Sequence, residues 1–122
     1  TGLDQVAEIA ANVALATNQS TAGTTHKRPV FNVKKWRFKS PTGGMNDVDR
    51  ATVGAFYSNA SSVFEWGLGE STRMANMLRV PRYAGVDSDP EYVSLTRAQV
   101  SPQFRFFFAD IGPTRVFGLP LN

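Results

Sequence analysis

Residues 63–72 read Val-Phe-Glu-Trp-Gly-Leu-Gly-Glu-Ser-Thr, an apolar run that leads through two glycines to a pair of hydroxyl residues. A short apolar run of this kind is typical of a buried strand, and Ser71 or Thr72 can cap a following helix. Gly67 and Gly69 allow the backbone to turn tightly and to pass close to a ligand. The segment therefore predicts a strand, a ligand-binding loop and a helix in direct succession.

The same alternation continues toward the C-terminus. The helix after the glycines must end before Pro81, and a second apolar run follows at residues 83–86. Asp89 as N-cap and Pro90 as first helical residue open another helix, and a Phe-rich run occupies residues 104–109. Strand, helix, strand, helix, strand at this spacing predicts an α/β fold, a partial Rossmann-like βαβαβ half-sheet that is parallel with strand order 3-2-1.

The N-terminal part of the chain, residues 1–45, has a different pattern. Apolar residues recur at helical spacing over residues 3–16, which predicts an amphipathic helix followed by a polar linker. Residues 30–38 are rich in β-branched and aromatic side chains and predict a basic extended segment, namely a strand. We expect two units, this N-terminal helix with its linker and basic segment, and a nucleoside-binding half-domain over residues 46–122.

Positive charge is concentrated in residues 27–39. This stretch holds six Lys and Arg residues and no acid, whereas the other seven cations face all ten acids of the chain. Phe31, Trp36 and Phe38 are interleaved with the cations, a combination suited to phosphates or nucleic acid, while exposed lysines also protect an edge strand from pairing. We expect exposed cations here and a protein partner bound through residues 1–45, with nucleic acid as the alternative.

The composition excludes several classes of protein. With no Cys and one His, the chain of 122 residues cannot form a disulfide scaffold, a thiol nucleophile or a multi-histidine metal site, so we expect no metal. No apolar run approaches the roughly 18 residues of a membrane-spanning helix. The sequence begins at Thr1 rather than Met, which fits removal of a targeting segment, as for an organelle, or a fragment of a longer protein, and leaves the compartment open.

Two acidic residues bear on the ligand of the glycine loop. Asp87 follows Gly67 by twenty residues, at the end of the second predicted strand, where a carboxylate can accept hydrogen bonds from both hydroxyls of a ribose. Glu70 within the loop would repel a pyrophosphate, and no Lys of a phosphate-binding loop follows the glycines. The pattern favours a nucleoside whose other end is cationic or zwitterionic.

Three segments together resemble the class I S-adenosylmethionine-dependent methyltransferases. Residues 63–72 resemble the family's first motif, in which an acid precedes the glycine loop. Residues 83–93, Tyr-Ala-Gly-Val-Asp-Ser-Asp-Pro-Glu-Tyr-Val, resemble its second strand, acidic residue and following helix. Residues 106–112, Phe-Phe-Phe-Ala-Asp-Ile-Gly, are similar to its third strand. The resemblance covers about residues 60–112 and implies a Rossmann-like fold with S-adenosylmethionine as cofactor.

The resemblance also implies roles for residues of the glycine loop. Glu65 would lie near the methionine end of the cofactor, and Gly67 and Gly69 would provide the close approach of the backbone. Ser71 takes the position of the family's third small residue, where it keeps a hydroxyl near the loop and adds bulk.

The remaining implied contacts and the activity follow from the same resemblance. Asp87 would bind the ribose hydroxyls and Asp110 the adenine amino group. The implied function is methyl transfer from S-adenosylmethionine to an unknown acceptor. Family members continue through a fourth strand, whereas this sequence stops at Asn122. The alternative function is therefore a non-catalytic structural or accessory subunit of a larger assembly, with a truncated methyltransferase-like fold.

Overall fold

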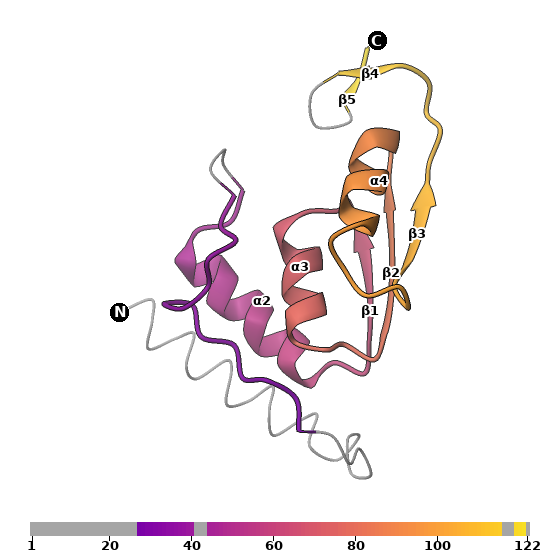
Figure 1. Cartoon of the computed structure of the whole chain (residues 1–122). Helices are drawn as coiled ribbons and strands as arrows, with labels where there is room; N and C mark the ends of the chain where they lie inside the picture. The colour runs from indigo at the N-terminus through magenta and orange to yellow at the C-terminus, as the bar shows by residue number, and fades with distance from the viewer. Residues whose placement is uncertain (1–26, 41–43, 116–118, 122) are drawn as a thin grey trace.

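The computed structural model describes residues 27–40, 44–115 and 119–121. Its centre is a parallel sheet of three strands, β1 (Ser62–Trp66), β2 (Arg82–Asp87) and β3 (Arg105–Phe108), hydrogen-bonded in the order β1-β2-β3 (Figure 1). The predicted α/β class, parallel pairing and 3-2-1 order are confirmed. The amphipathic helix predicted over residues 3–16 and its linker lie outside the described residues.

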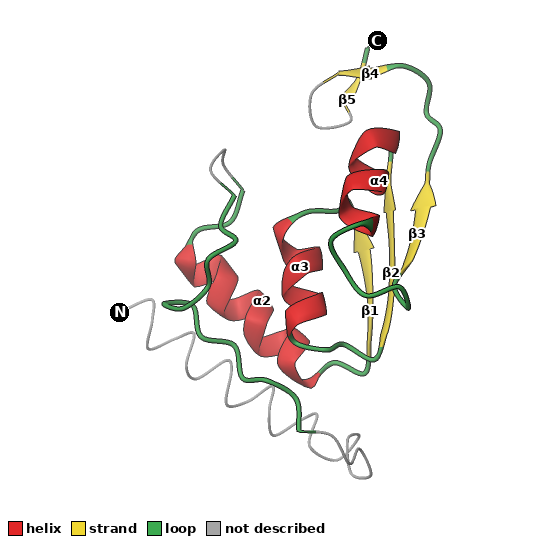
Figure 2. Ribbon diagram, in the orientation of Figure 1, coloured by secondary structure: helices red, strands yellow, loops and turns green. Residues whose placement is uncertain are grey.

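The helices of the described residues group on one side of the sheet (Figure 2). They are α2 (Asp47–Asn59), α3 (Glu70–Met77) and α4 (Pro90–Arg97). Beyond the sheet, β4 (Thr114–Arg115) pairs antiparallel with β5 (Leu119–Pro120). Since α3 joins β1 to β2 and α4 joins β2 to β3, both connections run from the carboxyl end of one strand to the amino end of the next.

Capping residues account for two of the three helix starts. Asn46 caps α2 by accepting a hydrogen bond from the Asp49 backbone N–H at 2.8 Å, and Asp89 caps α4 with Pro90 as its first residue, as predicted. The prediction that Ser71 or Thr72 caps α3 is wrong, because the helix begins at Glu70 with Gly69 as N-cap. Gly69 has no side chain that could act as a cap, and the Thr72 hydroxyl accepts a hydrogen bond from the Gly69 N–H at 3.0 Å.

The core lies between the sheet and the helices. On β1 and β2 every second residue faces the helices and is shielded from solvent, as the burial alternation of the strands shows. Leu68, Ala75, Val80, Tyr83 and Phe104 form its buried cluster. The rings of Tyr83 and Phe104 stack with their centroids 4.4 Å apart, so the aromatic pair closes the core beneath β3.

Residues 27–40, here named the basic strap, do not form the strand that was predicted over residues 30–38. The backbone turns at residues 33–35, where the Lys35 N–H donates to the Asn32 carbonyl at 3.1 Å. Trp36 is buried against α2 and α3 and is only 6% exposed. Because Trp36 and Arg28 both fasten the segment to the helices, a turn that directs Trp36 inward replaces the alternating pattern of a strand.

The cations of the basic strap are mostly exposed, as predicted. Lys27, Lys34, Lys35, Arg37 and Lys39 are all exposed. The exception is Arg28, which is half-buried and donates to three carbonyl oxygens, of Leu78 at 3.0 Å and of Ala60 and Tyr57 at 2.6 Å each. Burial lowers the pKa of Arg28. Its guanidinium thus bonds to carbonyls at the C-terminal ends of α2 and α3, where intrahelical donors run out.

Candidate functional site

Four of the residues singled out in the sequence meet at the carboxyl edge of the sheet. Gly67 and Gly69 follow β1 directly, Asp87 ends β2, and Asp110 lies two residues beyond β3. The parallel register aligns Trp66 with Val86, and Asp87 with Phe108, so these strand ends are neighbours. Ligands of open α/β sheets bind at such an edge.

The glycine loop is open toward solvent. Gly67 has φ +87°, a left-handed conformation that favours glycine, and its N–H donates to the Val86 carbonyl at 2.8 Å. A Cβ atom added to Gly67 would meet no described atom within 4 Å, and one added to Gly69 would meet only the Tyr92 hydroxyl, at 3.8 Å. Crowding by the described residues therefore explains neither glycine, and no described atom fills the space beside Gly67.

The Asp87 carboxylate ties this loop to the end of β2. Its two oxygens accept hydrogen bonds from the backbone N–H groups of Leu68 and Asp89, each at 2.9 Å. The residue is half-buried. A carboxylate has about four lone-pair positions, so two remain for a further donor. Asp87 is thus held rigidly beside the glycines with capacity left for ligand hydroxyls.

Glu65 is buried beneath the loop and accepts hydrogen bonds from three hydroxyl groups. It is 7% exposed. Tyr57 donates to its Oε2 at 2.7 Å, Thr72 donates to its Oε1 at 2.6 Å, and Tyr83 donates to Oε1 as well. The Thr72 hydroxyl in turn accepts from the Gly69 N–H at 3.0 Å. Glu65 therefore supports the glycine loop through the Thr72 hydroxyl, which bonds to both Glu65 and Gly69. Its carboxylate bonds to hydroxyl groups and does not form an ion pair with Arg73 or Arg105.

The two tyrosines of this network have strongly raised pKa values. Burial is the larger cause in both, and the negative charge of Glu65 is the second. Hydrogen bonding with Ser71 acts in the opposite direction on the pKa of Tyr57, and hydrogen bonding with Thr72 on that of Tyr83. Both phenols therefore stay protonated and act as hydrogen-bond donors to Glu65 throughout the ordinary pH range.

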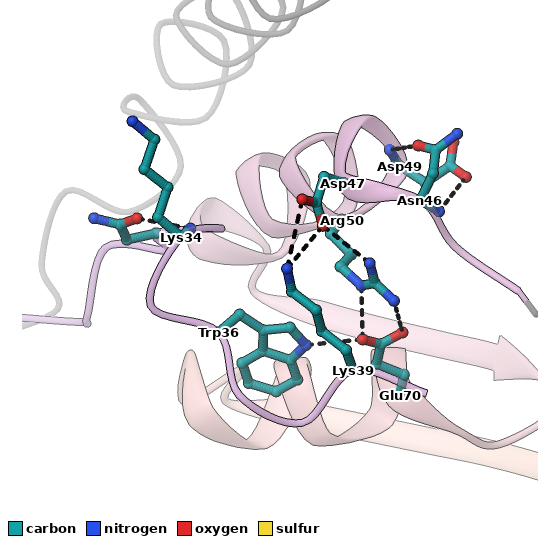
Figure 3. Close-up of polar contacts among 9 residues, drawn as sticks. Lys34, Trp36, Lys39, Asn46, Asp47, Asp49, Arg50 and Glu70 are labelled. Atoms are coloured by element: carbon teal, nitrogen blue, oxygen red, sulfur yellow. Dashed lines mark hydrogen bonds and ion pairs between the residues drawn. The ribbon is translucent and has the colours of Figure 1, made fainter. Parts of the chain in front are cut away.

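Glu70, the acid within the loop, is already paired (Figure 3). The Arg50 guanidinium donates to Glu70 Oε1 from Nε at 2.8 Å, and the Trp36 indole N–H donates to the same oxygen at 2.9 Å. Hydrogen bonding to Glu70 is the main cause that raises the pKa of Arg50. Glu70 therefore has a cation and an indole N–H beside its carboxylate, and its repulsion of a pyrophosphate stays a prediction.

The same cluster fastens the basic strap beside the glycine loop. Arg50 also contacts Asp47 at 2.9 Å, and Lys39 of the strap contacts Asp47 at 3.1 Å (Figure 3). These contacts, and above all the Lys39 hydrogen bond, lower the pKa of Asp47. Since Trp36 bonds directly to the first residue of α3, the strap forms one wall next to the candidate site.

Ser71 and Asp110 occupy less central positions. Ser71 lies half-buried in the first turn of α3, on the side of Tyr57. The exposed Asp110 carboxylate accepts from the Gly112 N–H at 3.0 Å and so shapes the turn after β3. Asp110 lies at the predicted edge, where its second oxygen is available to a donor.

Sequence reasoning missed the residues that support the site from behind. Arg50, Tyr57 and Tyr83 each donate to an acid next to the glycine loop. Gly85 was also overlooked: a Cβ there would meet the Tyr83 hydroxyl at 2.6 Å and would press on Leu68 of the loop. The sequence held one signal of this support, the hydroxyl residue Thr72 three positions after Gly69. From that spacing a side chain can reach back to the backbone N–H of a helix N-cap.

Within the described part of the chain no group of three His, Asp or Glu side chains is placed to hold a metal ion. Nor does any described helix have the length and apolar character needed to cross a membrane. The arrangement at the carboxyl edge is thus one of open glycines, a fixed carboxylate and a buried acid that organises the loop.

No family model matches this chain, and neither a curated protein nor a solved structure does.

Proposed function

We propose that the carboxyl edge of the sheet binds S-adenosylmethionine and that the chain transfers its methyl group to an acceptor. The observation that carries this proposal is the free space beside Gly67 and Gly69, next to a carboxylate, Asp87, that is fixed and still has free lone pairs. The resemblance of residues 63–72 and 83–93 to the methyltransferase motifs supports it, as does the parallel β1-β2-β3 order of a Rossmann-like half-sheet.

The residues of the chain would divide the work of binding. Asp87 accepts hydrogen bonds from the ribose hydroxyls, and the backbone at Gly67 and Gly69 passes close to the ligand. Asp110 receives the adenine amino group at the end of β3. Glu65 keeps the loop in shape through Thr72.

The bound cofactor supplies an activated methyl group on a sulfonium, so the protein mainly has to position the acceptor and exclude water. This requirement fits a chain with no Cys and a single His, since no nucleophilic side chain is needed. The wall formed by the basic strap beside the loop would hold the acceptor, because it carries exposed cations and is anchored by Trp36.

Titration calorimetry with S-adenosylhomocysteine tests the proposal. We expect heat of binding and thermal stabilisation with the unmodified chain. Gly67→Val should abolish both, because valine strains a residue at φ +87° and fills the ligand's space. Gly44→Val is the matched control: Gly44 has φ +99° and no described atom within 4 Å of its Cβ position, but it lies two residues before Asn46, the N-cap of α2, and outside the glycine loop.

Asp87→Ala should weaken binding by about 2–4 kcal/mol, since hydrogen bonds to a charged group are lost. It also releases the N–H groups of Leu68 and Asp89, so its unfolding should be measured alongside. If the unmodified chain gives no heat and no thermal stabilisation at millimolar ligand, the cofactor proposal fails.

The second candidate function is a non-catalytic accessory subunit. It is favoured by the hydrogen bonds that already engage the site's acids from within the chain: Glu65 by three hydroxyls and Glu70 by Arg50 and Trp36. Because both acids are already hydrogen-bonded within the chain, the site needs no ligand to be ordered. Failure of the titration, with folding intact, would support this function.

A further inference from the structure

The face of the sheet that points away from the helices is apolar and exposed. Phe64 and Trp66 of β1 and Phe107 of β3 lie on it, and they are 52%, 85% and 53% exposed. The alternate positions, such as Glu65 and Tyr83, face the helices and are buried. None of the described helices covers this face, which we name the open face.

The aromatic residues of the open face are contiguous. The Phe64 and Trp66 rings meet edge to face with centroids 5.2 Å apart. By register Trp66 aligns with Val86, and Val86 with Phe107, so an apolar row crosses all three strands at their carboxyl ends. Parallel sheets are normally covered on both faces, and a contiguous exposed apolar patch marks an interaction surface.

The charges on the open face are of one kind: Arg82 lies at the amino end of β2, and the register aligns Arg105 with Ala84 and so with Phe64. Arg82 of β2 and Arg105 of β3 are both exposed, and the strand positions of this face include no Lys, Asp or Glu. The centre of a protein interface is typically rich in Arg, Trp and Phe and contains few other charged residues. The face therefore fits a protein partner better than solvent.

We propose that the occupant of the open face is a second copy of this chain. A two-fold axis that lies between the two stacked open faces and runs perpendicular to the strands makes the strands of the two copies antiparallel. Arg82 of one copy then lies over the carboxyl ends of the other copy's strands. Arg82 lies four residues from Val86, about 13 Å along the strand. In this antiparallel stacking it lies over the partner's row of Trp66, Val86 and Phe107, where its guanidinium can interact with an aromatic ring. The face is thus complementary to itself, as an isologous dimer requires.

Sedimentation equilibrium of the full chain tests this inference, which does not depend on the proposed function. We expect a dimer, and we expect Trp66→Ser and Phe107→Ser to weaken it at least about 30-fold, the effect typical of a central interface residue. Arg82→Glu should weaken it as well. Phe38→Ser is the matched control, because Phe38 is an aromatic residue of the basic strap with 58% exposure and should leave the dimer unchanged.

These variants should fold, since the side chains they replace are exposed in a single copy, and circular dichroism checks that they do. Fluorescence gives a second readout: of the two tryptophans, Trp36 is buried and Trp66 is not, so dilution of the dimer should make Trp66 accessible to a soluble quencher. A chain that stays monomeric at millimolar concentration would overturn the inference, as would a dimer that is insensitive to Trp66→Ser. Binding of oligouridine to a monomer with quenching of Trp66 would also overturn it, in favour of nucleic acid.

Discussion

Replacing Glu65 by alanine removes the acceptor of three hydrogen bonds beneath the glycine loop. Tyr57, Tyr83 and Thr72 all donate to its carboxylate, and the residue is 7% exposed. The three hydroxyls come from α2, β2 and α3. Glu65, on β1, thus joins four elements, and its loss should be felt by all of them.

The magnitude follows from the contacts. A hydrogen bond to a charged group contributes about 1.5–3 kcal/mol, and a buried hydroxyl left without an acceptor costs a similar amount. The Tyr83 hydroxyl lies 3.2 Å from Thr72 Oγ1 and can donate there instead, so the three bonds are not lost additively. We expect Glu65→Ala to lower the free energy of unfolding by about 3 kcal/mol, a large share of the roughly 5–15 kcal/mol of a small domain.

Urea denaturation followed by circular dichroism measures this change. Glu65→Gln should cost less, because an amide oxygen still accepts one hydroxyl and the amide N–H can donate to another. Glu91→Ala is the control, since Glu91 is an exposed glutamate in the first turn of α4 and its replacement should cost less than about 1 kcal/mol. A loss below about 1 kcal/mol for Glu65→Ala would refute the view that this carboxylate organises the loop.

Three further predictions concern the elements around the site. The pKa values of Tyr57 and Tyr83 are raised above their ordinary value of about 10. Because the unfolded chain loses these protons first, the free energy of unfolding should be constant below about pH 10 and fall as the pH rises beyond it. Urea midpoints that do not change between about pH 9 and 11 would contradict this. Trp36→Ala should lower the free energy of unfolding by about 3 kcal/mol through lost packing and release the basic strap, which limited proteolysis would detect. Gly85→Ala should shift Leu68 and the loop, since its Cβ would lie 2.5 Å from Leu68 Cδ2 and 2.6 Å from the Tyr83 hydroxyl. A melting temperature equal to that of the unmodified chain would contradict this crowding.

The order of elements from residue 62 to 108 could be predicted from the sequence because its signals are local. Apolar runs, the Asp89-Pro90 helix start and the spacing of the glycines each act over a few residues, and two short helical connections bring successive parallel strands together. The clustering of Gly67, Gly69 and Asp87 at one edge followed from that order alone.

The partners of the site's acids were decided by the tertiary structure. Glu65 pairs with Tyr83 across 18 residues, Glu70 with Arg50 across 20 and with Trp36 across 34. No local pattern encodes these pairings, because they depend on which helix face meets which strand. The basic strap shows the same limit: its composition favours a strand, but the contacts of Trp36 with Glu70 and of Arg28 with three carbonyls outweigh that local preference. The physical reason is that β-propensity depends on the surface available for packing.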